Sequence, residues 1–342
     1  MLSKRERFQR ILLRQPVDRS LYSAWYHFIK TEADPRKLAD ATIEMQRKYN
    51  WDWLKVNPSV IHLAQVFGNE YDYSQYQGVY PLQTKQIIQT ADDLGKVQFT
   101  TVKRSRTLRE HTEMIDKIIR TFPELPVVAT IFSPLSILFL LLGCSPYVHQ
   151  NIYGSNTKLN VIQILKEYPK EAQQALLNIT KTLIDYINVL EQGNIDGIFY
   201  AVTGTGNRFV VPKDIFEEFS MPYDIKILKA TKKSTRIILH TCKDYSNPKY
   251  FDQTYPIDGI SWDSHQDHNP RVDDTFLHTI VGGIDHKNIS KLTSRILVEK
   301  FKSLKYKLGD GNYMISPECI IPESTSSMIL NSFNDNWEKG NS

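Results

Sequence analysis

Short apolar segments alternate with helical patterns along almost the whole chain, and this alternation restricts the possible folds more than any other feature. Eight segments are rich in Val, Ile or aromatic residues and are mostly followed by turn or polar residues, as is typical of β-strands. The predicted strands are residues 21–26, 53–57, 127–132, 197–202, 236–241, 259–263, 279–284 and 313–316. Strands that alternate with helices predict a parallel α/β sheet, and the count of eight favours a closed (β/α)8 TIM barrel.

Helical spacing of apolar residues occupies the segments between these strands. In residues 171–192, leucines and isoleucines recur at helical spacing, and Gly193 is expected to cap the end of the helix. The other predicted helices are residues 40–48, 59–67, 110–121, 159–168, 212–231, 291–304 and 323–333. Because the strands are almost continuously apolar, we expect both faces of the sheet to be buried.

The section from about 69 to 126 fits this alternation poorly. It is long and contains a polar patch with four tyrosines, Tyr71, Tyr73, Tyr76 and Tyr80. We therefore predict that it forms an excursion that caps the mouth of the barrel, and that an N-terminal extension precedes the first strand. TIM barrels commonly reach this length as one unit, so residues 1–342 are expected to form a single domain.

Composition argues against several classes of protein. The formal net charge is only +4, and no dense block of Lys and Arg is present, which disfavours nucleic acid as a partner. The apolar stretch 135–143 is too short to span a bilayer, and the first residues are polar and charged. Three cysteines, an odd number, do not make a disulfide framework. We expect a cytoplasmic protein with no membrane partner.

Two strand ends carry residues that suit a metal ion. His240 and Cys242 are two positions apart at the end of a predicted strand, so their side chains point to the same face. The strand at 313–316 is followed by Cys319, and in a closed barrel the three side chains converge at the mouth. One imidazole and two thiolates favour zinc, with a fourth position left for water, a carboxylate or a substrate thiol. The alternative is that these residues are ordinary buried core.

Active sites of TIM barrels lie at the C-terminal ends of the strands, so polar residues there are further candidates. The predicted substrate-binding residues are Asn57, Asp263, His265 and Glu318, and the predicted catalytic residues are Tyr200 and Asp285. Structural alternatives remain open for two of them. Tyr200 is either a proton donor or a packing residue with a satisfied hydroxyl group. Asp285 either binds substrate, orients a metal ligand or caps the following helix near Asn288.

Taken with the strand pattern, several motifs resemble those of the uroporphyrinogen decarboxylase-like superfamily, which includes corrinoid-dependent methyltransferases. The resemblance covers nearly the whole chain and depends on motifs that follow one another in the family's order. They are residues 3–8, 16–19, 52–58, 65–68, 130–135, 196–200, 216–223, 282–285 and 315–322. The resemblance implies a TIM barrel and an enzyme.

The residues that true uroporphyrinogen decarboxylases use are absent from the matching positions. The family binds the many carboxylates of its substrate with arginines in an N-terminal segment, and the corresponding stretch 21–28 contains none. Ser59 stands where the family has an aspartate. Because arginine alone offers a planar bidentate fork to each carboxylate, an octa-acid substrate is not expected.

The methyltransferase branch of the superfamily fits better. Methylcobamide:coenzyme M methyltransferases carry His-x-Cys on the fifth strand and a cysteine after the eighth, which match His240, Cys242 and Cys319. The resemblance implies that zinc holds a small thiol as a thiolate and that a corrinoid or similar donor, or a corrinoid protein, supplies the methyl group. Ser264 stands where the family often has a glutamate ligand. Glu318, where the family usually has glycine, is then a ligand, a base near the metal or a solvated charge at the rim.

Three functions are therefore considered. The first is a zinc-dependent methyltransferase that moves a methyl group between a corrinoid and a small thiol. The second is a decarboxylase-like lyase acting on a tetrapyrrole or another carboxylic acid. The third is a non-catalytic barrel that binds a corrinoid or tetrapyrrole. Relatives on the decarboxylase branch are often dimers, so the resemblance also implies a homodimer.

Overall fold

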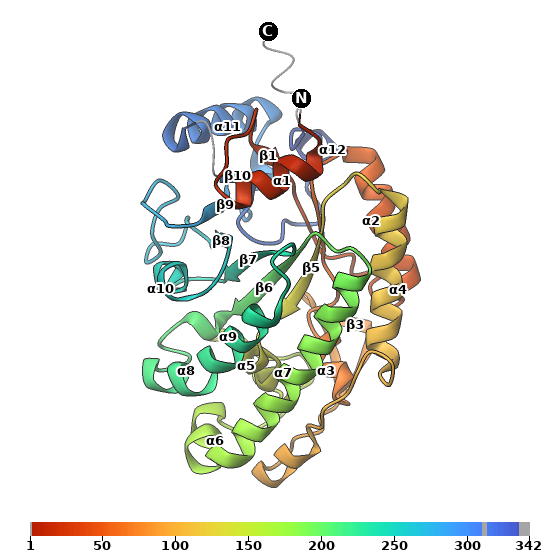
Figure 1. The fold of residues 1–342 in the computed structure, drawn as a ribbon. Helices are drawn as coiled ribbons and strands as arrows, with labels where there is room; N and C mark the ends of the chain where they lie inside the picture. Colours follow the sequence, from red (N-terminus) through yellow and green to blue (C-terminus); the bar gives the residue numbers. More distant parts are fainter. Residues whose placement is uncertain (1, 310–312, 335–342) are drawn as a thin grey trace.

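The fold is an α/β structure built on one curled, parallel sheet of eight strands. The computed structural model describes residues 2–309 and 313–334. Its strands are β1 (Leu21–Tyr22), β2 (Leu54–Val56), β5 (Val127–Phe132), β6 (Gly197–Thr203), β7 (Arg236–Thr241), β8 (Gly259–Ser261), β9 (Thr279–Ile284) and β10 (Tyr313–Pro317). They are arranged in the order β1-β10-β9-β8-β7-β6-β5-β2 (Figure 1). All eight predicted strands are present, and the parallel α/β class is confirmed.

Hydrogen bonds connect the two edge strands of this sheet. The backbone N–H of Asp52, just before β2, donates to the carbonyl of Tyr22 in β1 at 2.9 Å. The N–H of Tyr22 donates in turn to the Asp52 carboxylate at 3.0 Å, and the hydroxyl of Ser23 donates to the carbonyl of Trp53 at 2.7 Å. The sheet thus curls until its two edges meet, which is consistent with a TIM-barrel-like fold.

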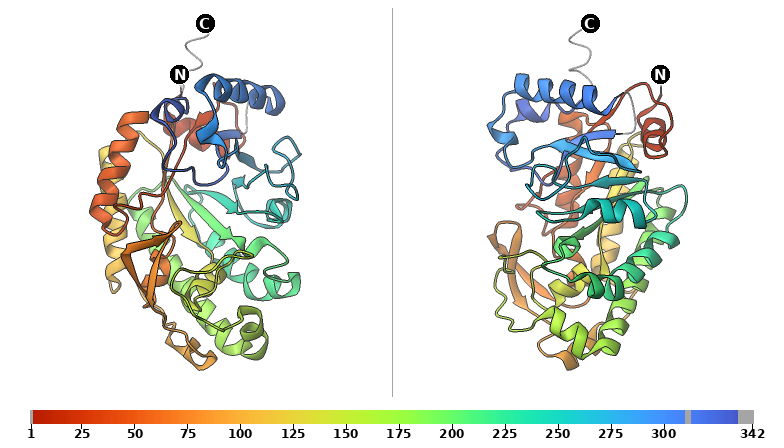
Figure 2. Two further views of the ribbon diagram at one scale, coloured as in Figure 1. Left: turned by 180° about the vertical axis from the view of Figure 1, so that it is seen from behind. Right: turned by 90° about the vertical axis from the view of Figure 1, so that its left-hand side faces the viewer.

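Helices surround the curled sheet, as the two views of Figure 2 show. They are α2 (Pro35–Tyr49), α3 (His62–Val66), α4 (Arg106–Thr121), α5 (Pro134–Leu141), α6 (Val161–Glu167), α7 (Pro169–Gln192), α8 (Lys213–Phe219), α9 (Met221–Ala230), α10 (Pro248–Thr254), α11 (Ser294–Leu308) and α12 (Ser327–Leu330). The helix predicted over 212–231 is divided at Ser220, because Pro222 in the first turn of α9 has no N–H to continue the helical bonds. A large apolar core fills the space between the sheet and these helices.

The N-terminal helix α1 (Lys4–Leu12) closes one end of the barrel. Phe8 and Ile11 belong to a second apolar cluster that also contains inward-facing strand residues such as Val128 and Ile238. Two polar contacts fix α1 to the starts of strands. Arg5 pairs with Asp196 at 2.7 Å just before β6, and Thr279 at the start of β9 donates to the Ile11 carbonyl at 2.7 Å. The helix therefore covers the end opposite to the strand C-termini.

The section predicted as an excursion, residues 69–126, has two different parts. Its first part is an antiparallel hairpin, β3 (Glu70–Gln77) and β4 (Tyr80–Lys85), followed by the short helix η1 (Ala91–Lys96). Its second part is α4, which packs against α2 and α7 (Figure 1). The predicted excursion was therefore too long, because the apolar face of α4, with Leu108 and Ile115, belongs to the outer layer of the barrel.

No helix in the described part of the chain is both long and apolar enough to cross a membrane.

Candidate functional site

A cavity of about 190 Å³ lies at the C-terminal ends of the strands. Its walls come from β2, β5, β6 and β7, from the loops after β1, β9 and β10, and from the turn of the β3–β4 hairpin. The side chains of Trp25 and Phe199 form part of its apolar wall, and Val79 and Tyr80 line it from the hairpin. Among the residues that the structure describes, no arginine, aspartate or glutamate lines this cavity.

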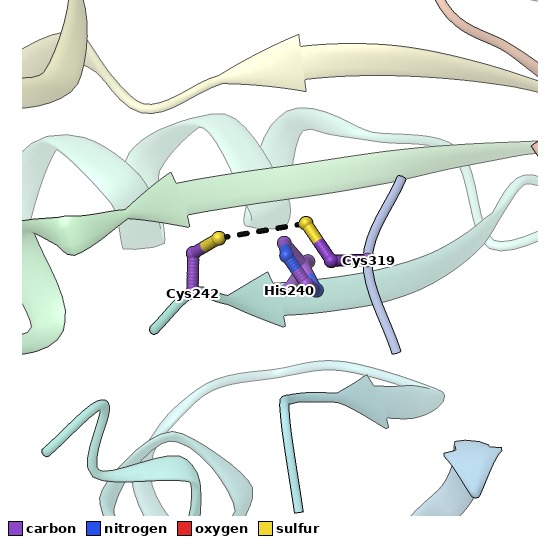
Figure 3. A group of neighbouring side chains, drawn as sticks. All are labelled: His240, Cys242 and Cys319. Carbon is purple, nitrogen blue, oxygen red and sulfur yellow. Dashed lines mark hydrogen bonds between the residues drawn. The ribbon is translucent and has the colours of Figure 1, made fainter. Parts of the chain in front are cut away.

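His240, Cys242 and Cys319 meet in this cavity, as the sequence predicted. Ile238, His240 and Cys242 alternate along β7 and its end, so all three face the interior of the barrel. Figure 3 shows that Cys319 reaches the other two side chains from the segment after β10. The three potential ligand atoms lie within 4.8 Å of one another.

The distance between the two sulfur atoms suits a tetrahedral metal. The Cys242 and Cys319 sulfurs are 3.7 Å apart. Two thiolates bound to zinc at about 2.3 Å with tetrahedral angles have sulfur atoms roughly 3.8 Å apart. Nδ1 of His240 lies 3.2 Å from the Ser261 hydroxyl, so the other ring nitrogen remains for a metal. The donor set and its spacing therefore fit zinc.

A hydrogen bond joins the thiols of Cys242 and Cys319. The hydrogen bond from Cys242 holds the pKa of Cys319 well below its usual range, and burial opposes this effect. The same hydrogen bond, together with burial, raises the pKa of Cys242. The two shifts have opposite directions, so Cys319 is the thiol of the pair that loses its proton more readily, as binding of a metal requires.

Lys55 places its amine beside this pair of thiols. It is buried on β2, and its Nζ donates to Oδ1 of Asn57 at 2.6 Å. Nζ also lies 4.7 Å from the centre of the Phe199 ring and 5.3 Å from that of Trp25. Burial lowers the pKa of Lys55 to about 7, while the thiols of Cys319 and Cys242 act in the opposite direction. Asn57 itself lines the cavity, where substrate binding was predicted for it.

Glu318 is buried, which rules out one of its three alternatives, the solvated charge at the rim. Its carboxylate accepts hydrogen bonds from the N–H of Ser264 at 2.9 Å, from Nδ1 of His265 at 2.7 Å and from the N–H of Gly283 at 3.3 Å, and it also accepts one from the Ser264 hydroxyl. An added Cβ at Gly282 would lie 3.2 Å from Cγ of Glu318. Glu318 therefore connects the loops after β8 and β10 with β9, next to the ligand Cys319.

Asp263, His265 and Glu318 form a second group with ligand atoms within 4.8 Å of one another. Burial raises the pKa of Glu318 and the hydrogen bond from His265 opposes this, while the Glu318 carboxylate raises the pKa of His265. None of the three is among the residues that line the cavity in the described part of the chain. Contrary to the substrate-binding role predicted for them, their geometry supports a role in positioning the loop that carries Cys319.

Tyr200 does not reach the cavity, which corrects its predicted catalytic role. Phe199 and Ala201 line the cavity, and because strand side chains alternate, Tyr200 between them points outward. Its hydroxyl donates to the buried carboxylate of Asp224 on α9 at 2.6 Å. The prediction used only the position of Tyr200 near the end of a strand and not the face of the strand on which its side chain lies.

Asp285 has the structural role that was one of its alternatives. Its carboxylate accepts hydrogen bonds from the backbone N–H of Lys287 at 2.9 Å, from the N–H of Asn288 at 3.3 Å and from Nδ2 of Asn288 at 2.7 Å. These bonds hold the turn after β9, and Asp285 is absent from the described cavity wall. The prediction that Asp285 is catalytic is thus corrected, because its acceptor atoms are engaged by this turn.

Two further histidines line the cavity and were missed as site residues. His27 lies on the loop after β1, and His286 lies on the loop after β9. Both are buried, and each faces a buried carboxylate, Glu32 for His27 and Asp263 for His286. No spacing pattern in the sequence marks them, because loops rather than a strand period bring them to the cavity.

Comparisons with known proteins agree with this fold. The family model described as uroporphyrinogen decarboxylase (URO-D) matches residues 4–335. A search of curated proteins gives no match. A solved methyltransferase from Methanosarcina mazei is 13% identical, with a TM-score of 0.74 and coverage of 100% of both chains.

Two other solved structures share the fold at lower similarity. A B12-independent methionine synthase from Shewanella is 10% identical with a TM-score of 0.57, covering 95% of this chain and 96% of that one. A putative vitamin-B12-independent methionine synthase from Listeria monocytogenes is 11% identical with a TM-score of 0.57, covering 95% of this chain and 98% of that one. At these identities the likeness concerns the fold, whereas the family model spans nearly all of the sequence. The chain therefore belongs to the uroporphyrinogen decarboxylase family.

Proposed function

We propose that this protein is a zinc-dependent methyltransferase that moves a methyl group between a corrinoid, or a similar donor, and a small thiol. The observation that carries the proposal is the convergence of His240, Cys242 and Cys319 at the cavity, with sulfur atoms 3.7 Å apart. The fold it shares with the M. mazei methyltransferase also supports the proposal. We further propose that the protein is cytoplasmic, works with a corrinoid protein and forms a homodimer, as its sequence predicts.

The three ligand residues would hold the metal, and a bound zinc would supply a Lewis acid that keeps an acceptor thiol deprotonated near neutral pH. The rest of the cavity supports the same chemistry. The ammonium of Lys55 lies in a cavity whose described wall contains no carboxylate, so it offers a countercharge to a thiolate. The rings of Trp25 and Phe199 exclude water from this charge pair.

The size of the cavity favours a small acceptor. A volume of about 190 Å³ is smaller than the roughly 300–1,000 Å³ of sites that enclose drug-sized ligands. A tetrapyrrole is larger than such ligands, so a corrinoid would present its methyl group from the mouth of the barrel. The same volume, and the absence of arginine from the described wall, weigh against a lyase acting on a tetrapyrrole with many carboxylates.

A methyl-transfer assay tests the proposal. Zinc-loaded protein is incubated with methylcob(III)alamin and a series of small thiols, and the visible spectrum of the corrinoid and the formation of thioether are followed. We expect transfer by the wild type and by Cys144→Ala, since Cys144 lies outside the cavity, and none by Cys319→Ala. Loss of a carboxyl group from uroporphyrinogen, with no methyl transfer to any thiol, would favour the lyase. Binding of the corrinoid with neither reaction would favour the non-catalytic alternative.

A further inference from the structure

His27 and Glu32 form an imidazole–carboxylate pair on the wall of the cavity. Nδ1 of His27 lies 3.4 Å from Oε2 of Glu32, and the side chains are 7% and 0% exposed. Neither atom has an aligned hydrogen bond to any group in the described part of the chain. A carboxylate this deeply buried is costly unless a positive group can form beside it, and a proton taken up by the His27 ring would supply that group.

The groups around the pair hold the carboxylate in place. The hydroxyl of Tyr76, on β3, donates to the other oxygen of Glu32, Oε1, at 3.2 Å. His62 on α3 interacts electrostatically with His27, but burial lowers the pKa of His62 to about 4, so this neighbour is neutral near neutral pH. Lys55 on β2 lines the same cavity as His27. Glu32 is thus the negative group that faces the His27 ring.

The tautomer of His27 follows from this arrangement. The nearby carboxylate favours the neutral tautomer with its hydrogen on Nδ1, and in that tautomer Nε2 carries a lone pair that is able to accept a proton from a molecule in the cavity that His27 lines. Imidazoles oriented by a carboxylate in this way are effective general bases, and their hydrogen bonds often tighten only when substrate is bound. The cavity is also the place where an acceptor thiol would meet the candidate metal ligands.

We propose that His27 accepts the proton of the incoming thiol and that Glu32 is a positioning residue that stabilises the resulting imidazolium. This inference rests on the proposed function. The S–H bond breaks, its electron pair stays on the sulfur, which the metal site would hold as a thiolate, and the proton forms a bond to Nε2 of His27. The neutral thiol and neutral imidazole thus become a thiolate and an imidazolium, and no proton leaves the cavity.

His286 is the competing proton acceptor, and its surroundings are less suited to the role. Its Nδ1 is 3.9 Å from the Asp263 carboxylate, a longer contact than that of His27 with Glu32. The same Asp263 oxygen is also 3.5 Å from Nζ of Lys287 and accepts a hydrogen bond from Gln266 at 2.5 Å. The Asp263 carboxylate is therefore already shared with other donors, whereas Oε2 of Glu32 faces the His27 ring and has no aligned hydrogen bond within the described part of the chain.

Proton counting tests the inference. Zinc-loaded protein is titrated with 2-mercaptoethanol by calorimetry in buffers of different ionisation enthalpy, at a pH below the pKa of the free thiol. In the wild type we expect close to zero protons released to the buffer for each thiol bound, because His27 keeps the proton. In His27→Gln we expect about one proton released, as metal–thiolate binding requires when no internal acceptor is present. Glu32→Gln should lie between these values, and His286→Gln should match the wild type.

Two controls separate this inference from the proposed function. Zinc content must be equal in all four proteins, and cobalt-substituted samples must show a rise in sulfur-to-metal charge-transfer absorption when the thiol is added. If the wild type shows no such rise, the proposed function is wrong. If the absorption rises in every protein but His27→Gln releases the same number of protons as the wild type, the role of His27 is wrong. A change confined to His286→Gln would assign the proton to His286.

Discussion

Cys242 and Cys319 are close but not bonded to each other, and this spacing is central to the account. Both thiols are free, and their sulfur atoms are 3.7 Å apart, far longer than the roughly 2.05 Å of a disulfide. Together with the neighbouring imidazole of His240, they form a set of donors that could coordinate a zinc ion. A site of this kind lies on a barrel that has its own large core, so its loss should not unfold the protein.

Cys319→Ala and His240→Ala are therefore expected to remain folded while binding zinc much more weakly. Each removes one of three ligands, but neither removes a large apolar group from the core. We expect the free energy of unfolding of the metal-free proteins to change by less than about 2 kcal/mol, within the range of ordinary substitutions. Zinc per chain and cooperative denaturant unfolding check this, with Cys144→Ala as the matched control. If either variant unfolds while the control is unaffected, the cluster is structural.

Lys55→Met should make the metal-free protein more stable, and increasingly so as the pH falls from about 10 to about 7. The folded pKa of Lys55 is lowered to about 7, so the unfolded chain binds a proton in this range that the folded protein does not. Wild-type stability is thus lost as the pH falls, by up to roughly 4 kcal/mol, and methionine avoids this loss. Denaturant unfolding at several pH values measures it.

Lys243→Met is the control for this prediction, since Lys243 also lines the cavity but is exposed. A pH-independent difference between Lys55→Met and the wild type would contradict the buried ammonium. In the zinc-loaded protein, we expect Lys55→Met to bind a small thiol about tenfold more weakly or worse, because the thiolate loses its countercharge.

Single residues also show where sequence reasoning reaches its limit. The period of a strand was enough to predict that His240 and Cys242 share a face, and the same period explains why Tyr200 faces away from the cavity. Lys55 was not predicted to lie beside the two thiols, because a lysine within an apolar segment gives no sign of which groups surround it. Glu318 was misjudged because its partners Ser264 and His265 come from a distant loop.

At the scale of elements, β6 and α9 are joined by a buried polar cluster behind the cavity. The carboxylate of Asp224 on α9 accepts hydrogen bonds from the hydroxyls of Tyr200 at 2.6 Å, Tyr255 at 2.9 Å and Ser220 at 2.9 Å. Burial raises the pKa of Asp224 to about 7, and these three donors oppose the increase. Because this carboxyl group ionises near neutral pH, the stability of the packing of α9 against the sheet should depend on pH.

Asp224→Asn should flatten part of the dependence of stability on pH. The folded pKa of Asp224 is above its unfolded value, so its stabilising contribution is complete below about pH 4 and is lost as the pH rises through about 7. The difference between wild type and Asp224→Asn should change by up to roughly 4 kcal/mol over this interval. Unfolding measured from pH 4 to pH 8 checks this, and a constant difference would contradict it. Zinc content should not change, because Asp224 lies outside the cavity.

The strands were more predictable than the elements between them. Strands of a barrel that is buried on both faces are short apolar runs, which the sequence displays directly, and β5, β7 and β9 begin and end where predicted. The division between α8 and α9 depends on one proline, Pro222. The hairpin β3–β4 contains no apolar run from which its strands could be predicted. Most of its residues are exposed or half-buried, so the polar sequence that identified an excursion did not indicate where its strands lie.

At the scale of the whole molecule, the barrel has one closed and one open end. Helix α1 covers the starts of the strands, where Arg5 and Ile11 make polar contacts with the chain around β6 and β9. The cavity and its histidines, thiols and lysine lie at the other end, so the chemistry is separated from the contacts that close the barrel. Sequence predicted this polarity because it follows from the fold, and it also predicted that the section with Tyr80 caps the mouth, whereas the loops that supply His27 and His286 to the cavity follow no such rule.

The measurement that tests the central claim most directly is X-ray absorption at the zinc edge, on zinc-loaded protein before and after a small thiol is added. We predict one or two nitrogen or oxygen neighbours near 2.1 Å and two sulfur neighbours near 2.3 Å, with about three sulfur neighbours after the thiol binds. This result would place His240, Cys242 and Cys319 around the metal and the thiol on it. A protein that retains no zinc, or whose zinc has no sulfur neighbours, would contradict the account.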